Sequence, residues 1–166
     1  MIVLGIDPGT ATTGYGLVED NEAGEAKLIG YGAILTPAGG PMSERLLAIH
    51  QEITALIRTA GPGSVAVEEL FFSRNVTTAL SVGQARGVVL LAAAQAGLTV
   101  YEYKPNQVKQ ALVGYGNADK RQIQEMLRMM LTLEEIPRPD DAADAVAVAV
   151  CHLHSMRMRK LLGEAQ

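Results

Sequence analysis

Hydrophobic and polar positions follow two different periods along this chain. Short β-branched or apolar runs of strand length are bounded by turn residues, and longer segments carry an apolar residue every three or four positions, as helices do. The predicted strands cover 2–6, 14–20, 27–35, 64–68 and 99–103. The predicted helices cover about 43–59, 77–96, 105–112, 119–132 and 139–157, with Ser43 placed to cap the first.

The order of these elements predicts the architecture. Three strands joined by short turns suit a meander, and the later strands alternate with helices. A meander followed by right-handed crossovers gives an α/β fold, a five-stranded mixed sheet flanked by α-helices. With 166 residues, 48% of them hydrophobic and 19% charged, the chain has the size and composition of one globular domain. We expect residues 1–156 to form this domain and residues 157–166 to be a C-terminal tail.

Location is predicted from what the sequence does not contain. No apolar run approaches the roughly 20 residues that span a bilayer, and the start MIVLGIDPGT has neither the basic region nor the cleavage site of a signal peptide. The single cysteine, Cys151, cannot form an internal disulfide and favours a reducing compartment. We therefore expect a cytoplasmic protein without a membrane partner.

Acidic residues stand at the ends of predicted elements. Asp7 closes the first strand and Glu68 the fourth, two strands that can lie parallel and side by side. In PDDAADA (139–145), Asp141 and Asp144 share one face of the last helix. A helix N-terminus also attracts acids, so a capping role fits that pair equally well, and Asp140 is the expected cap.

The chemistry of such a group of acids is restricted. Converging carboxylates repel one another unless they bind a cation or take up protons. Oxygen-only ligands favour Mg²⁺ or Mn²⁺, and two such ions can hydrolyse a phosphodiester. The Gly-rich turn DPGTATTG (7–14) either cradles a phosphate or is only a tight turn into the second strand. An actin-like ATPase fits less well, because 166 residues leave no room for a second lobe.

Charge is spread unevenly. The formal net charge is −4, yet residues 74–128 carry +4 and the remainder −8. Such segregation permits a polyanionic partner, although a solvated basic face is its commoner cause.

Five segments together resemble the RuvC family of Holliday-junction resolvases, in order and over about residues 1–155. These segments are LGIDPGTATTGYG (4–16), VAVEELFFSRN (65–75), LSVGQARGVVLLAAA (80–94), YKPNQVKQALVGYGNADKRQI (103–123) and DDAADAVAVAV (140–150). The resemblance implies an RNase H-like fold and a homodimer that cuts two opposed strands of a four-way DNA junction with Mg²⁺ or Mn²⁺. It also implies RuvA–RuvB, a branch-migration complex, as a partner.

Carried over by position, the resemblance implies a role for individual residues. The catalytic and metal-binding carboxylates would be Asp7, Glu68, Asp141 and Asp144, with Glu69 excluded because strand alternation points it to the opposite face. Phe71 would stack on an unpaired base, and helix 77–96 would form the dimer interface. The DNA phosphates would be contacted by Lys109 and Lys120, and further by Arg74, Lys104 and Arg121. An RNase H-like nuclease acting on RNA and a non-catalytic junction-binding module are the alternatives.

Overall fold

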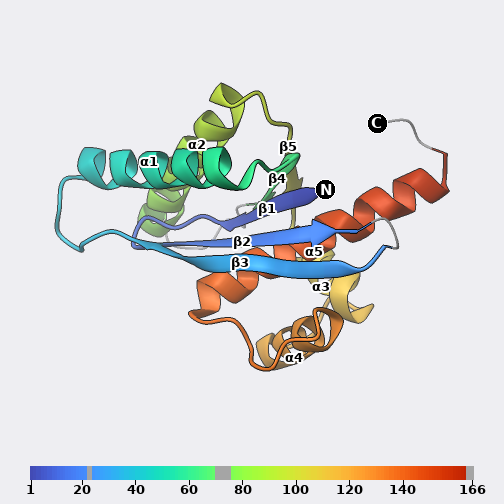
Figure 1. Ribbon diagram of the computed structural model, residues 1–166. Helices are drawn as coiled ribbons and strands as arrows, with labels where there is room; N and C mark the ends of the chain where they lie inside the picture. Colours follow the sequence, from blue (N-terminus) through green and yellow to red (C-terminus); the bar gives the residue numbers. More distant parts are fainter. Residues whose placement is uncertain (22–23, 70–75, 164–166) are drawn as a thin grey trace.

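The computed structural model describes residues 1–21, 24–69 and 76–163. Its elements, in chain order, are β1 (Ile2–Asp7), β2 (Thr12–Asp20), β3 (Ala26–Leu35), α1 (Met42–Ala60), β4 (Ser64–Glu68), α2 (Val76–Gln95), β5 (Val100–Tyr103), α3 (Pro105–Val113), α4 (Lys120–Met130) and α5 (Asp140–Leu161). The strands form one sheet in the order β3-β2-β1-β4-β5, with helices on both faces (Figure 1). Strands β1 to β3 are antiparallel neighbours, and β4 and β5 run parallel to β1, which confirms the predicted mixed sheet.

The two faces of the sheet have separate hydrophobic cores. Helices α1 and α2 cover one face, where Ile49 and Ile53 of α1 pack in one cluster with Leu4 of β1. Helices α3, α4 and α5 lie on the other face, where Val146 of α5 packs in a cluster with Val3 of β1. Neighbouring residues of β1 point to opposite sides, so this one strand supplies both cores.

Helix α5 lies very close to β1 and β2 because three glycines leave room for it. A Cβ atom at Gly5 would come within 2.2 Å of the Ala145 carbonyl oxygen, and one at Gly14 within 2.0 Å of the Asp141 carbonyl oxygen. At Gly16 a Cβ atom would lie 2.5 Å from Val146 Cγ2. Protein interiors are close-packed and cannot absorb such overlaps without movement of the helix. These glycines therefore set the depth at which α5 docks.

Two helix ends differ from the predictions. Helix α1 begins at Met42 after Pro41, with no side-chain cap, so the prediction that Ser43 caps it is wrong: Ser43 lies inside the first turn. Helix α5 has Pro139 at its N-cap, and Asp140 makes no capping bond, so that prediction is also wrong. In both cases a proline with extended ψ already starts the helix.

The C-terminal end of α5 runs further than its sequence predicts. The helix continues to Leu161, so the domain boundary expected at 156 lies inside a continuous helix. Arg157 in this last part forms an ion pair with Asp20 of β2, between Nη2 and Oδ1 at 2.5 Å. A contact between residues so far apart in sequence holds these turns against the sheet.

Helix α2 is rich in apolar residues, yet most of it is not buried. Only four of its twenty residues are buried, Ala85, Val89, Ala92 and Ala93. Leu80 and Leu91 are 65% and 52% exposed. By length and composition α2 could span a membrane, so the expectation that no such apolar segment exists is wrong, although one such helix is weak evidence for a membrane span.

Candidate active site

Asp7 and Glu68 lie next to each other at the ends of the two central parallel strands. Ile6 of β1 pairs with Val67 of β4, so the next residue of each strand, Asp7 and Glu68, projects at the same edge of the sheet. Their charges act on each other, since the Glu68 carboxylate contributes to the raised pKa of Asp7. The two acids therefore lie close enough to influence each other's ionisation.

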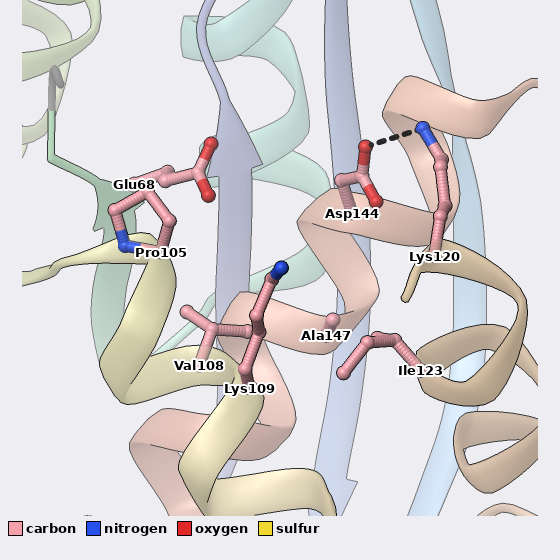
Figure 2. Close-up of a pocket in the computed structure, with 8 residues that line it drawn as sticks. All are labelled: Glu68, Pro105, Val108, Lys109, Lys120, Ile123, Asp144 and Ala147. Atoms are coloured by element: carbon pink, nitrogen blue, oxygen red, sulfur yellow. Dashed lines mark hydrogen bonds and ion pairs between the residues drawn. The ribbon is translucent and has the colours of Figure 1, made fainter. Parts of the chain in front are cut away.

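Asp144 reaches the same place from α5. Together with Glu68 it lines a pocket of about 260 Å³ whose remaining walls come from α3, α4 and α5 (Figure 2). The lining residues are Glu68, Pro105, Val108, Lys109, Lys120, Ile123, Asp144 and Ala147. Glu68 is part of this lining and Glu69 is not.

Asp141 lies one helical turn before Asp144 on the same helix. Its backbone carbonyl lies directly over Gly14, the β2 residue that pairs with Asp7. Its carboxylate contributes to the electrostatic environment of both Asp7 and Asp144, although it is not part of the pocket wall. The structure therefore brings all four predicted acids to one edge of the sheet.

The pKa values of these carboxyls reflect burial without enough positive charge. Burial, followed by the charges of Glu68, Asp144 and Asp141, raises the pKa of Asp7 to about 8, while Lys120 acts in the opposite direction. Burial and then Asp144 raise the pKa of Glu68. Burial also raises the pKa of Asp144, and Lys120 opposes this rise. A bound cation would relieve all three.

The basic side chains of the pocket hold different partners. Lys120 Nζ lies 3.0 Å from Asp144 Oδ2 and 3.3 Å from Asp140 Oδ2, so it bridges two acids. Lys109 Nζ donates to the Ala118 carbonyl oxygen at 2.8 Å and points into the pocket beneath Glu68 (Figure 2). Both lysines line the pocket together with Glu68 and Asp144, so a phosphate that enters it would meet their positive charge.

The structure describes only some of the other residues predicted to contact DNA. Lys104 is exposed at the N-cap of α3, and Arg121 is exposed beside Lys120 at the start of α4. Phe71 and Arg74 lie outside the described residues. All six residues stay predictions as DNA contacts.

One positioning residue was missed. Asp119 caps α4: its side chain accepts from the Gln122 backbone N–H at 2.9 Å, and the Gln122 side chain accepts from the Asp119 N–H in return. This capping box fixes the first turn of α4 and therefore the base of Lys120. The signal was present in the sequence as Asp-x-x-Gln directly before the helix (119–122).

The donor set fits hard cations. Asp7, Glu68 and Asp144 offer only carboxylate oxygens, the ligands that Mg²⁺ and Mn²⁺ prefer, and their raised pKa values indicate a site with too little positive charge. Within residues 1–21, 24–69 and 76–163, no three His, Cys, Asp or Glu side chains are already drawn together at ligand distances. Converging carboxylates repel one another, so binding of a cation would draw them closer.

A mixed five-stranded sheet with acids at the ends of its central parallel strands and on the helix beside them defines an RNase H-like nuclease. A family model described as crossover junction endodeoxyribonuclease RuvC matches residues 3–152. The chain belongs to this family of metal-dependent endonucleases.

Relatives and solved structures agree over almost the whole length. A protein of Desulfitobacterium hafniense, described as crossover junction endodeoxyribonuclease RuvC, is 60% identical over 99% of both chains. The Thermus thermophilus RuvC structure superposes with a TM-score of 0.87 at 44% identity, covering 95% of this chain and 96% of that one. T. thermophilus RuvC in complex with a Holliday junction substrate gives 0.87 at 41% identity, with the same coverage.

Proposed function

We propose that this protein resolves four-way DNA junctions by hydrolysing one phosphodiester bond in each of two opposed strands. The observation that carries the proposal is the meeting of Asp7, Glu68 and Asp144 at one sheet edge, beside Lys109 and Lys120. Family membership gives the class of reaction, and T. thermophilus RuvC has been solved with a Holliday junction substrate.

The four acids Asp7, Glu68, Asp141 and Asp144 would hold Mg²⁺, with Mn²⁺ as a substitute, and two ions in each site. Ions bound there supply activation of the attacking water and stabilisation of the leaving oxygen. The acids themselves orient the site: Asp7 and Glu68 are fixed by the ends of two paired strands, and Asp144 by a buried helix. Rigid supports of this kind preserve the geometry that an in-line attack requires.

The basic residues bind and orient the DNA. Lys109 and Lys120 would neutralise phosphates next to the scissile bond. Lys104 and Arg121 would contact the strand further out, since both are exposed at the starts of the two helices that carry those lysines. Phe71 and Arg74 are proposed for base stacking and phosphate contact from the sequence resemblance alone.

Paired cutting requires two sites in one assembly. We assign the dimer interface to α2, the helix predicted at 77–96, because its exposed Leu80 and Leu91 leave an apolar side for a second copy. A two-fold dimer would present identical sites to a junction of nearly two-fold symmetry. The RuvA–RuvB complex is the proposed partner that moves the junction, and the cytoplasm is the proposed location.

The proposal is tested by incubating the purified protein with an end-labelled four-way junction in Mg²⁺, in Mn²⁺ and in EDTA. We expect paired nicks at symmetric positions in both metals and none in EDTA. A linear duplex and an RNA–DNA hybrid serve as parallel substrates. Preferred cutting of the hybrid would identify an RNA-directed nuclease, and tight junction binding without nicks in either metal would identify a non-catalytic binding module.

A further inference from the structure

A chain of hydrogen bonds, called the relay below, links the Thr10 carbonyl oxygen, the Thr36 hydroxyl and the Arg45 guanidinium beside the turn that follows Asp7. The Thr36 hydroxyl donates to the Thr10 carbonyl oxygen at 2.5 Å, and the Thr36 N–H donates to the Ala11 carbonyl oxygen at 3.1 Å. Arg45 Nε donates to the Thr36 hydroxyl oxygen at 2.8 Å. Thr10 and Thr36 are both buried. The Thr36 hydroxyl thus orients Arg45, and Thr36 is itself bonded to the turn that contains Thr10 and Ala11.

The relay lies at the same edge of the sheet as the carboxylates. Thr10 follows Asp7 by three residues, and Thr36 comes directly after Leu35, which pairs with Thr12 at the start of β2. Arg45 is in the first turns of α1, on the face of the sheet opposite to α3, α4 and α5 (Figure 1). Arg45 thus lies on the opposite face of the sheet from Lys109 and Lys120, beside the end of β3, which is two strands from β1 in the sheet order.

Within the described residues, Arg45 forms no ion pair with an acid. Among the described residues, the arginines and lysines with ion pairs are Arg86, Lys120, Arg128, Arg138 and Arg157. Glu44, the neighbouring residue, is exposed and adjacent along the helix, and residues at i and i+1 do not face each other. A cation near a helix N-terminus also opposes the helix dipole. Arg45 is placed unfavourably for the free protein, so a bound anion would stabilise it there.

The two terminal nitrogens of Arg45 remain available for a ligand. Only its Nε is used within the described chain, by the Thr36 hydroxyl. A guanidinium fixed through Nε presents its terminal N–H groups as a planar pair, a geometry that matches two oxygens of a phosphate.

We propose that Arg45, oriented by Thr36, binds a backbone phosphate of the DNA strand as it leaves the acidic site on the α1 side. This inference deepens the proposed function and rests on it. The strand would then be neutralised by lysines before the scissile bond and by Arg45 beyond it. The turn DPGTATTG supports the relay through the Thr10 and Ala11 carbonyl oxygens.

The test measures junction binding in EDTA, where no cutting occurs, over a series of salt concentrations. Each phosphate contact adds about 0.9 to the slope of log affinity against log salt. Arg45→Gln should lower that slope by about 0.9 and weaken binding by roughly three- to tenfold at 0.1 M salt. Arg58→Gln is the matched control: it removes the same charge from the last turn of the same helix, about 20 Å away, and should change neither quantity.

A second variant separates charge from structure. Arg45→Lys keeps the charge but cannot reproduce the Nε bond, so it should retain most of the salt slope and lose part of the affinity. Equal weakening in Arg45→Gln and Arg45→Lys with the wild-type slope in both would assign Arg45 a purely structural role and overturn the inference. Wild-type affinity in Arg45→Gln would overturn it as well. If the wild-type protein itself fails to bind the junction, the proposed function fails first.

Discussion

Two groups of acids in this site differ in how their charge is balanced. The inner pair, Asp7 and Glu68, is held by strand ends, and burial is the main cause of its raised pKa values. The outer group, Asp140 and Asp144, shares the ammonium of Lys120, and Asp140 has a lowered pKa because Lys120 and Gln124 donate hydrogen bonds to it. Asp140 and Asp7 thus face opposite electrostatic conditions, whereas the pKa of Asp144 stays raised because its burial outweighs the effect of Lys120.

The difference shows how such a site can fold before it binds a cation. Four ionised carboxylates at one edge would repel one another. At neutral pH the inner pair avoids this because the pKa of Asp7, about 8, keeps that carboxyl protonated, and the outer group avoids it by sharing Lys120, which is 50% exposed. Cation binding would displace the proton from the first group and the lysine from the second.

The largest expected effect comes from the inner pair. Asp7→Asn should lower the rate of cleavage by roughly 10³-fold, about 4 kcal/mol of barrier, because an amide is a poorer metal ligand than a carboxylate. Single-turnover nicking of a labelled junction in Mg²⁺ measures it. Junction affinity in EDTA should stay within a factor of about two, since no phosphate contact is lost. Glu52→Gln, an exposed acid on α1, is the matched control and should cut at the wild-type rate.

The second effect concerns stability and pH in the metal-free protein. The pKa of Asp7 is about 8 in the folded state and 3.8 as a model group, so folding favours its protonated form. This contribution to stability is complete below about pH 4 and is lost as the pH rises through 8. Between pH 6.5 and 8.5 in EDTA, the wild-type melting temperature should fall by roughly 5 °C and that of Asp7→Asn by less.

The pH dependence that His152 gives to stability has the opposite sign, and it determines the lower limit of that pH range. Burial, with a smaller effect of Arg159, lowers its pKa from 6.5 to about 4. Its two ring nitrogens are hydrogen-bonded to the hydroxyl groups of Ser64 and Tyr103. Its contribution is complete above about pH 6.5 and is lost as the pH falls through 4. Melting curves above pH 6.5 therefore isolate the carboxyls. Equal pH dependence in wild type and Asp7→Asn would contradict the high pKa of Asp7.

The third effect tests the outer group. Lys120→Gln removes a positive charge next to Asp144, so Mg²⁺ should bind the DNA-free protein about fivefold more tightly by calorimetry at pH 8.5, equivalent to roughly 1 kcal/mol. Arg121→Gln removes the neighbouring charge, which forms no ion pair within the described chain, and should leave Mg²⁺ affinity unchanged. The opposite result, weaker Mg²⁺ binding in Lys120→Gln, would mean that Lys120 supports the site and does not compete with the cation.

The smallest effect is expected at Asp140. Asp140→Asn should change the cleavage rate by less than about twofold, because Asp140 is exposed and its substitution leaves Asp144 paired with Lys120. The same nicking assay applies, with Asp144→Asn in parallel. A loss in Asp140→Asn as large as that in Asp144→Asn would move Asp140 into the metal-binding group.

Much of the fold could be predicted because local patterns agree with it. The strands and helices follow the apolar periods and the Gly- and Pro-rich breaks, and most ends lie within two residues of prediction. The two failed caps have a common cause: Pro41 and Pro139 begin the helices before Ser43 and Asp140 can. The end of α5 could not be predicted because its last turns depend on the Arg157–Asp20 ion pair, a tertiary contact.

The site was predictable to a similar degree. Asp7 and Glu68 follow from strand ends, and Asp144 follows from helical spacing, since both signals are local. The pairing of Lys120 with Asp140 and Asp144 joins positions at least 20 residues apart, and no sequence period indicates it. The hold of Thr36 on Arg45 is likewise set by how β3 and α1 meet.

Gly5, Gly14 and Gly16 lie beneath the helix that carries Asp141 and Asp144. They set the spacing between helix and sheet. The size of a single methyl group at this contact decides how far the acids of α5 lie from the acids of the strands. Substitution of any of these glycines by alanine would push α5 away from the sheet and widen the cation site, although the altered residue itself would contact neither metal nor DNA. The geometry of the catalytic centre thus depends on a part of the sheet that performs no chemistry.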